Sequence, residues 1–197
     1  MKITSTMRKH VLLLFCCAAL AACVTSRPKL APLPWSQRVS NLQHVISWQM
    51  DGRAAVVVGA QGWQASMNWH QSDAVTELHL AGPFGVGAVE IEKTAAGLSL
   101  NGAPPSDAVL AQVHDRLGFD LPMDRFRYWL LGVPDPRVPF DLSRNAEDRA
   151  AKLTQDGWTV DYDKYMQVNG DLMPARIVLS REGVRVRVVV DRWEGLR

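Results

Sequence analysis

Apolar and polar residues alternate with a period of two along most of the chain between residues 48 and 100. The alternating segments are 48–56, 63–70, 78–80, 86–91 and 98–100. Residues typical of turns fill the gaps at 59–62, 71–74 and 95–97. This pattern predicts antiparallel strands joined as a meander, with one apolar face and one largely polar face.

Helical spacing occurs in three places. Apolar residues in 35–45 lie near helical spacing and predict a short amphipathic helix. Ser106 is a suitable N-cap for a second helix, whose apolar stripe of Val109, Val113 and Leu117 ends at Gly118. Pro122 precedes a third helix over 123–131, which is followed by Gly132.

Strands resume in the last third of the chain, at 151–154, 158–162, 176–179 and 184–193. Residues 155–157 and 182–183 have the composition of hairpin turns. We find no internal repeat and no second domain. The predicted fold class is mainly β with helices (α+β), in which a strongly curved antiparallel sheet has its concave face covered by helices.

The apolar face of this sheet and the helices over it carry many large side chains: Trp48, Met50, Trp63, Met67, Trp69, Trp129 and Trp158. One interpretation is an ordinary filled core. The other is an apolar cavity for a lipid-like ligand, because a curved sheet has room for one and methionine adapts to mobile chains. The composition is compatible with both.

The loop Ala81-Gly82-Pro83-Phe84-Gly85 is unusual for a connection between two strands. Glycine and proline favour a tight turn, whose tip normally carries polar residues. Phe84 either folds back onto the sheet or forms an exposed apolar finger that enters a bilayer or contacts an acyl chain. Burying one phenylalanine contributes about 1.5–3 kcal/mol, which is enough to favour a transient membrane contact but too little to anchor a protein.

The N-terminus has the features of a secretory leader. Lys2, Arg8 and Lys9 precede an apolar run over 11–20, which is shorter than the roughly 20 residues of a spanning helix. The run ends in Leu20-Ala21-Ala22-Cys23, which resembles the bacterial lipobox. The resemblance implies cleavage after residue 22 and acylation of Cys23 with a diacylglycerol and an N-acyl chain. The alternatives are a generic signal peptide with an incidental cysteine, or an N-terminal membrane anchor.

Residues 23–34 follow as a tether that contains three prolines and shows no periodicity. The leader holds three basic residues and no acid, so the 22 basic residues fall to 19 against 20 acidic ones in the mature chain. The formal charge therefore changes from +2 to −1, which makes nucleic acid an improbable partner. Because Cys16 and Cys17 leave with the leader, we expect no disulfide and no thiolate metal site.

Four segments together resemble the LolB family of outer-membrane lipoprotein receptors. They are the lipobox, Leu80-Ala81-Gly82-Pro83-Phe84-Gly85, the segment from Phe126 to Pro134, and Val190-Asp191-Arg192-Trp193. The segment FRYWLLGVP over 126–134 is the most specific of them. Gly82-Pro83-Phe84-Gly85 takes the place of an N-P-L-G-like loop in the family, so an apolar tip is kept while leucine becomes phenylalanine.

The resemblance implies a half-open antiparallel β-barrel of about eleven strands with a helical lid over an apolar cavity. It implies a receptor that accepts acylated lipoproteins from the periplasmic carrier LolA and inserts them into the outer membrane, without metal or nucleotide. Pro83, Phe84 and Gly85 would form the membrane-insertion loop. The expected location is the inner leaflet of the outer membrane, facing the periplasm. By resemblance to lipoproteins in which an aspartate after the acylated cysteine favours retention in the inner membrane, Val24 after Cys23 points to the outer membrane. Residues 35–197 would form a single, monomeric domain.

Two other classes of function are considered. An enzyme is disfavoured because the sequence lacks HExxH, G-x-S-x-G and Walker motifs, although Asp120, Asp124, Asp161 and Asp163 offer possible carboxylate pairs. A non-catalytic scaffold lipoprotein would bind a protein partner of the envelope through its sheet edge or Phe84. Such a scaffold would not take up lipid chains.

Overall fold

The computed structural model describes residues 33–196, so Cys23, the leader and most of the tether lie outside the described residues. Ten antiparallel strands form one sheet: β1 (Ser47–Val58), β2 (Gln61–Ser72), β3 (Val75–Ala81), β4 (Val89–Thr94), β5 (Gly97–Leu100), β6 (Phe140–Arg144), β7 (Ala150–Gln155), β8 (Trp158–Val168), β9 (Asp171–Arg181) and β10 (Val184–Glu194). Within residues 33–196 three α-helices accompany the sheet: α2 (Trp35–Gln43), α3 (Asp107–Leu117) and α4 (Met123–Leu130).

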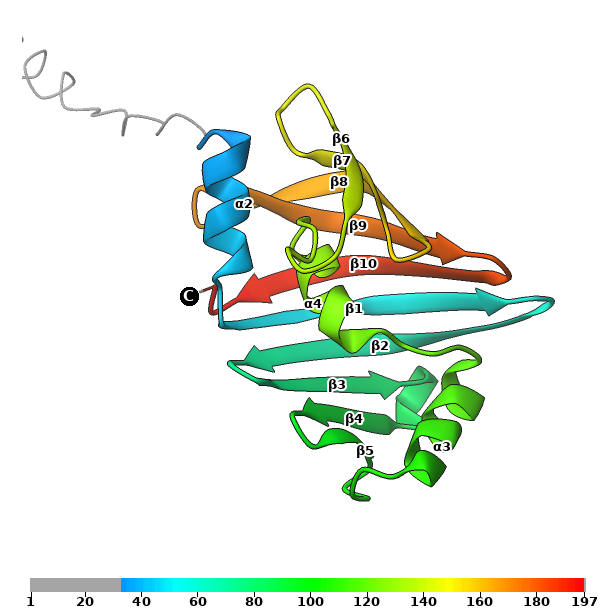
Figure 1. Ribbon diagram of the computed structural model, residues 1–197. Helices are drawn as coiled ribbons and strands as arrows, with labels where there is room; N and C mark the ends of the chain where they lie inside the picture. Colours follow the sequence, from blue (N-terminus) through cyan, green and yellow to red (C-terminus); the bar gives the residue numbers. More distant parts are fainter. Residues whose placement is uncertain (1–32, 197) are drawn as a thin grey trace, which may run out of the picture. The chain divides into compact units, whose positions relative to one another are not determined.

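The order of strands in the sheet is β5-β4-β3-β2-β1-β10-β9-β8-β7-β6. The first and last strands of the chain therefore pair in the middle, while β5 and β6 are the two edges and do not pair with each other. The segment that joins β5 to β6 carries α3 and α4 across one face of the sheet (Figure 1). We call this covered face the inner face and the opposite one the outer face. The half-open, curved α+β fold is confirmed, with ten strands in place of about eleven.

In the strands, the positions that are apolar in the sequence are buried, and the polar positions between them are more exposed. In β1 the side chains of Trp48, Met50, Ala54 and Val56 are buried on the inner face. The alternation in β1 continues unchanged through the buried Gly52, although the register of its pairing with β10 shifts there at a bulge. The phase changes in β10 instead, between Val190 and Trp193. A Cβ atom at Gly52 would lie 2.3 Å from the carbonyl oxygen of Val189, so only glycine allows the two strands to approach so closely there.

The helices begin and end close to the expected positions. The Ser106 hydroxyl accepts a hydrogen bond from the backbone N–H of Val109 at 3.2 Å, which caps α3, and Gly118 ends it with φ +83°. Helix α2 lies at the end of the sheet where β1 begins (Figure 1). Its Arg38 is buried and forms an ion pair with Asp171 at 3.2 Å. Burial lowers the pKa of the Arg38 guanidinium, and the charge of Asp171 opposes that shift.

The hydrophobic core is one cluster on the inner face, and all its fully buried members lie between Leu42 and Trp193. Residues 24–197 therefore contain every core residue found among the described residues, and we expect them to fold without the leader. The sequence interpretation underestimated the C-terminal hairpins. Strand β6 was not predicted, and β8 and β9 continue to a turn at Asn169 and Gly170, both of which have positive φ.

Candidate functional site: an opening in the sheet beside an exposed phenylalanine

The Phe84 loop, residues 82–87, leaves the sheet at the end of β3. The turn is tight, since the N–H of Gly85 donates to the carbonyl of Gly82 at 3.0 Å and the N–H of Gly82 donates to that of Val86 at 3.0 Å. A Cβ atom at Gly82 would lie 2.6 Å from the Val86 oxygen. Phe84 sits at the tip with φ +58°, a left-handed conformation that costs about 1–2 kcal/mol for a residue with a side chain.

Phe84 is fully exposed, and Val86 in the same loop is largely exposed. The structure therefore shows an outward-pointing finger, and Phe84 does not fold back onto the sheet. A large aromatic side chain held in a strained turn without packing contributes nothing to the core. Such a residue is better explained by a function than by stability.

Strand β3 is shorter than its neighbour, and this difference opens the wall of the sheet. Only Ser66–Ser72 of β2 pairs with β3, so residues 61–65 of β2 have no strand on that side within the described part of the chain. The Phe84 loop and the C-terminal end of α3 lie beside this unpaired stretch. They enclose a hollow of about 210 Å³, which we call the mouth, lined by Trp63, Ala65, Gly82, Val86, Leu117 and neighbouring residues.

A second cavity lies beneath the helices on the inner face, and we call it the inner cavity. Its volume is about 30 Å³ and its lining is wholly apolar: Ala54, Val56, Trp63, Met67, Leu78, Leu80, Leu117, Phe119, Leu121, Phe126, Val186 and Val188. A space of this size holds about one water-sized sphere and no acyl chain. In this conformation the inner face is packed, and a bound chain would require the helices to move.

The mouth and the inner cavity share Trp63, Leu80 and Leu117, so these residues separate the two spaces. The indole N–H of Trp63 donates to the carbonyl of Leu117 at 3.3 Å. This bond connects β2 to the last residue of α3. A chain passing from the mouth to the inner cavity would have to displace this contact.

The seven predicted cavity residues occupy different places. Trp63 and Met67 line the inner cavity. Trp48 and Trp69 stack with centroids 5.9 Å apart and an interplanar angle of 6°, deeper along the inner face beside Met50. Trp129 and Trp158 pack against Phe126. All except Trp63 are fully buried, and their role in holding an acyl chain stays a prediction.

The two covering helices are held with unequal strength. The indole N–H of Trp129 in α4 donates to Oε1 of the buried Gln155 at 2.8 Å, and the Tyr162 hydroxyl donates to the Trp129 carbonyl at 2.9 Å. In contrast, α3 buries only Val109, Val113 and Leu117. Since local opening begins where few groups are buried, we expect α3 to move and α4 to stay.

The loop after α4 is also fixed, by a buried carboxylate. The carboxylate of Asp135 accepts hydrogen bonds from the guanidinium of Arg137 at 2.8 and 2.9 Å. Burial alone would raise the pKa of Asp135, but the hydrogen bonds and charge of Arg137 outweigh that effect and the pKa is lowered. This pair supports the end of α4.

Three of the four aspartates considered above lie in separate ion pairs and not in a shared carboxylate pair. Asp120 lies 2.7 Å from His114, Asp124 lies 3.8 Å from Lys93, and Asp161 lies 3.5 Å from Lys152, each in a separate surface pair. Across residues 33–196, His, Cys, Asp and Glu side chains do not gather in groups of three that would hold a metal ion. In the same residues no helix is both long and apolar enough to cross a bilayer.

Several residues of the site were not identified from the sequence. Leu117 at the end of α3 alternates with Phe119 and Leu121 in the connection to α4, and all three line the inner cavity. The available signal was this apolar alternation, which continues past the end of the helix. No local sequence signal marked the role of Gln155 or the unpaired stretch 61–65 of β2. Both features depend on which strands become neighbours in the sheet.

Comparison with known proteins identifies the class and then the family. A crystal structure of a LolA superfamily protein from Nitrosomonas europaea has the same fold, with a TM-score of 0.50 and 10% identity over 84% of this chain and 94% of that one. At this identity the likeness concerns the fold alone. The family model for outer membrane lipoprotein LolB matches residues 46–193, and the chain belongs to the LolB family.

Two relatives named outer-membrane lipoprotein LolB match over nearly their whole length. The protein of Ectopseudomonas mendocina is 28% identical, with 95% of this chain and 97% of the relative covered. That of Thiobacillus denitrificans is 31% identical, with 89% and 92% covered. The resemblance inferred from the four sequence segments is confirmed.

Proposed function

We propose that this protein is a lipid-anchored receptor of the outer membrane that accepts lipoproteins from the periplasmic carrier LolA and inserts them into that membrane. Acyl chains on Cys23 would hold it in the inner leaflet, with residues 35–197 facing the periplasm. The observation that carries the proposal is the fully exposed Phe84 next to a mouth that adjoins an apolar inner face. Membership of the LolB family supports the cargo and the carrier.

The energetics of moving an acyl chain from carrier to membrane explain why such a site needs no cofactor. Each methylene group moved from an apolar environment into water costs about 0.8 kcal/mol, so free passage of an acyl chain through water is prohibitive. A receptor that shields the chain between carrier and membrane avoids this cost. The inner face would take the chain when α3 moves, and Phe84 would bring the mouth to the bilayer.

The direct test is a transfer experiment. A lipoprotein is loaded on purified LolA, residues 24–197 are added as a soluble domain, and the cargo is followed by pull-down. We expect cargo to move to this domain and to displace a bis-ANS-type dye from it. A folded domain that takes neither cargo nor dye would contradict the receptor and favour the scaffold lipoprotein.

Loosening the contact between Trp63 and α3 is expected to speed uptake. Trp63→Phe removes the hydrogen bond to Leu117 and keeps an apolar ring, so it lowers the cost of displacing α3 by about 1 kcal/mol. We expect about fivefold faster hydrogen exchange in residues 107–117 and faster dye uptake.

Trp35→Phe is the matched control for that variant. Trp35 lies on α2, at the far end of the sheet from the mouth, and makes no side-chain hydrogen bond within residues 33–196. It should leave exchange in α3 unchanged. If Trp63→Phe leaves α3 exchange unchanged as well, the contact does not restrain the helix.

A further inference from the structure

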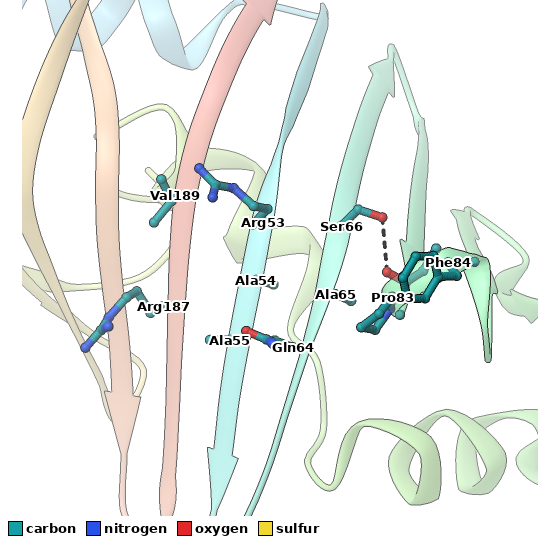
Figure 2. Close-up of a pocket in the computed structure, with 13 residues that line it drawn as sticks. Arg53, Ala54, Ala55, Gln64, Ala65, Ser66, Pro83, Phe84, Arg187 and Val189 are labelled. Carbon is teal, nitrogen blue, oxygen red and sulfur yellow. Dashed lines mark hydrogen bonds between the residues drawn. The ribbon is translucent and has the colours of Figure 1, made fainter.

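A third hollow lies on the outer face of the sheet, beneath the Phe84 loop. Its volume is about 730 Å³, and it contacts the polar face of β1, β2 and β10. Short side chains, among them Ala55, Ser66 and Ala81, form its floor. Figure 2 shows Pro83 and Phe84 on one side of this groove and Arg187 on the other, with the short side chains between them.

The groove is continuous with the mouth. Both are lined by Gln64, Ala65 and Gly82, and the mouth in turn adjoins the inner cavity through Trp63 and Leu117. The Ser66 hydroxyl donates to the carbonyl of Ala81 at 3.1 Å and holds the base of the loop against β2 (Figure 2). A chain that leaves the inner cavity through the mouth therefore emerges beside the outer-face groove.

The charges around the groove are uneven. Arg53 is neutralised by Asp191, whose carboxylate oxygen lies 2.8 Å from its guanidinium. Arg187 and Arg185 alternate with buried valines in β10 and so point outward, and both are exposed. Neither guanidinium forms an ion pair with a carboxylate anywhere in residues 33–196. Within the described residues these two cations near the groove therefore have no carboxylate partner, on a mature chain whose formal charge is −1.

We propose that this groove binds the phosphate headgroup of an anionic phospholipid, with Arg187 as the main contact and Arg185 beside it. The arrangement fits a lipid at a membrane surface, because a cation suits the phosphate and an apolar finger suits the acyl region next to it. The two interactions together hold the mouth against the bilayer and orient it for release. The inference deepens the proposed membrane contact of Phe84 and rests on it.

The test measures binding of residues 24–197, which lack the acylated cysteine, to vesicles by co-sedimentation. One set of vesicles is phosphatidylcholine alone and the other also contains phosphatidylglycerol. Arg187→Gln is expected to weaken binding to the anionic vesicles about fivefold. The double variant Arg185→Gln with Arg187→Gln should bind about fivefold more weakly again. Each factor corresponds to the loss of about 1 kcal/mol per cation near an anionic surface. Binding to phosphatidylcholine alone should not change.

Arg192→Gln is the matched control. Arg192 is an exposed arginine of the same strand, but its guanidinium is paired with Asp51 and Glu194. The variant carries the same change in net charge as Arg187→Gln and should bind anionic vesicles like the wild type. If Arg187→Gln and Arg192→Gln weaken binding to anionic vesicles equally, the effect comes from net charge alone and the headgroup site is overturned.

Two further outcomes separate this site from the proposed function. If Phe84→Glu abolishes vesicle binding while the arginine variants bind like the wild type, the membrane finger stands and the headgroup site is wrong. If Phe84→Glu and the arginine variants all bind like the wild type, both are wrong. Inorganic phosphate is also added at constant ionic strength. If it displaces the domain from anionic vesicles under this condition, the groove is a site for free anions and the proposal is overturned.

Discussion

Phe84→Glu is expected to slow release of cargo into membranes by about tenfold or more and to leave folding and cargo acceptance unchanged. The wild-type ring gains about 1.5–3 kcal/mol when it enters an apolar environment, which corresponds to a factor of about ten or more. A carboxylate loses this gain and adds the cost of bringing a charge toward the acyl region. Folding should not suffer, since Phe84 is fully exposed.

The measurement is a two-stage assay. Cargo is first transferred from LolA to the domain, and release is then followed after vesicles are added. Phe84→Leu, which keeps an apolar tip, should release cargo nearly as well as the wild type. Phe84→Gly suits the backbone, because φ is +58° there, and should lose release without loss of stability. A Phe84→Glu domain that fails to accept cargo would show that the finger is not confined to insertion.

Gln155→Leu is expected to lower the free energy of unfolding by about 3–5 kcal/mol, a large loss for a single substitution. The Gln155 side chain is buried and uses its full hydrogen-bonding capacity. Its Oε1 accepts from the Trp129 indole and the Asp135 N–H, and its Nε2 donates to the carbonyls of Asp135 and Val138. Leucine would leave these buried groups unpaired, each at a cost of about 1–3 kcal/mol with partial relief by rearrangement.

Urea unfolding of residues 24–197, followed by tryptophan fluorescence, measures this loss. Thr154→Val is the control, because Thr154 is exposed on the same strand and its replacement should change stability by less than about 0.5 kcal/mol. A loss below about 1 kcal/mol for Gln155→Leu would mean that the end of α4 is not held by this side chain. The opposite roles assigned to α3 and α4 would then lose their basis.

Much of the secondary structure could be predicted from the sequence because its signals are local. The alternation in β1 and β2 predicted which side chains are buried, and Ser106 and Gly118 predicted the two ends of α3. The composition around Phe84 likewise identified an unusual loop. Strand β6 was missed although Phe140 and Leu142 alternate with polar residues, because the alternation is only five residues long and directly follows the proline-rich stretch 134–139.

The features that define the site depend on contacts between distant segments. Trp63 meets Leu117 only because α3 crosses the inner face next to β2. Arg187 reaches the groove below Phe84 because β10 pairs with β1 in the middle of the sheet. No local pattern around either residue reports these neighbours.

The sequence by itself determined most of the strands, the helix ends and the apolar character of the inner face, because periodicity and caps are properties of short segments. It also determined the family, through four short segments in a fixed order. Only the tertiary structure decided that Phe84 points outward, that the inner face is packed in this conformation, and that the unpaired stretch 61–65 of β2 opens a mouth. These outcomes follow from differences in strand length and from packing between elements far apart in the chain, so they emerge only when the sheet is assembled.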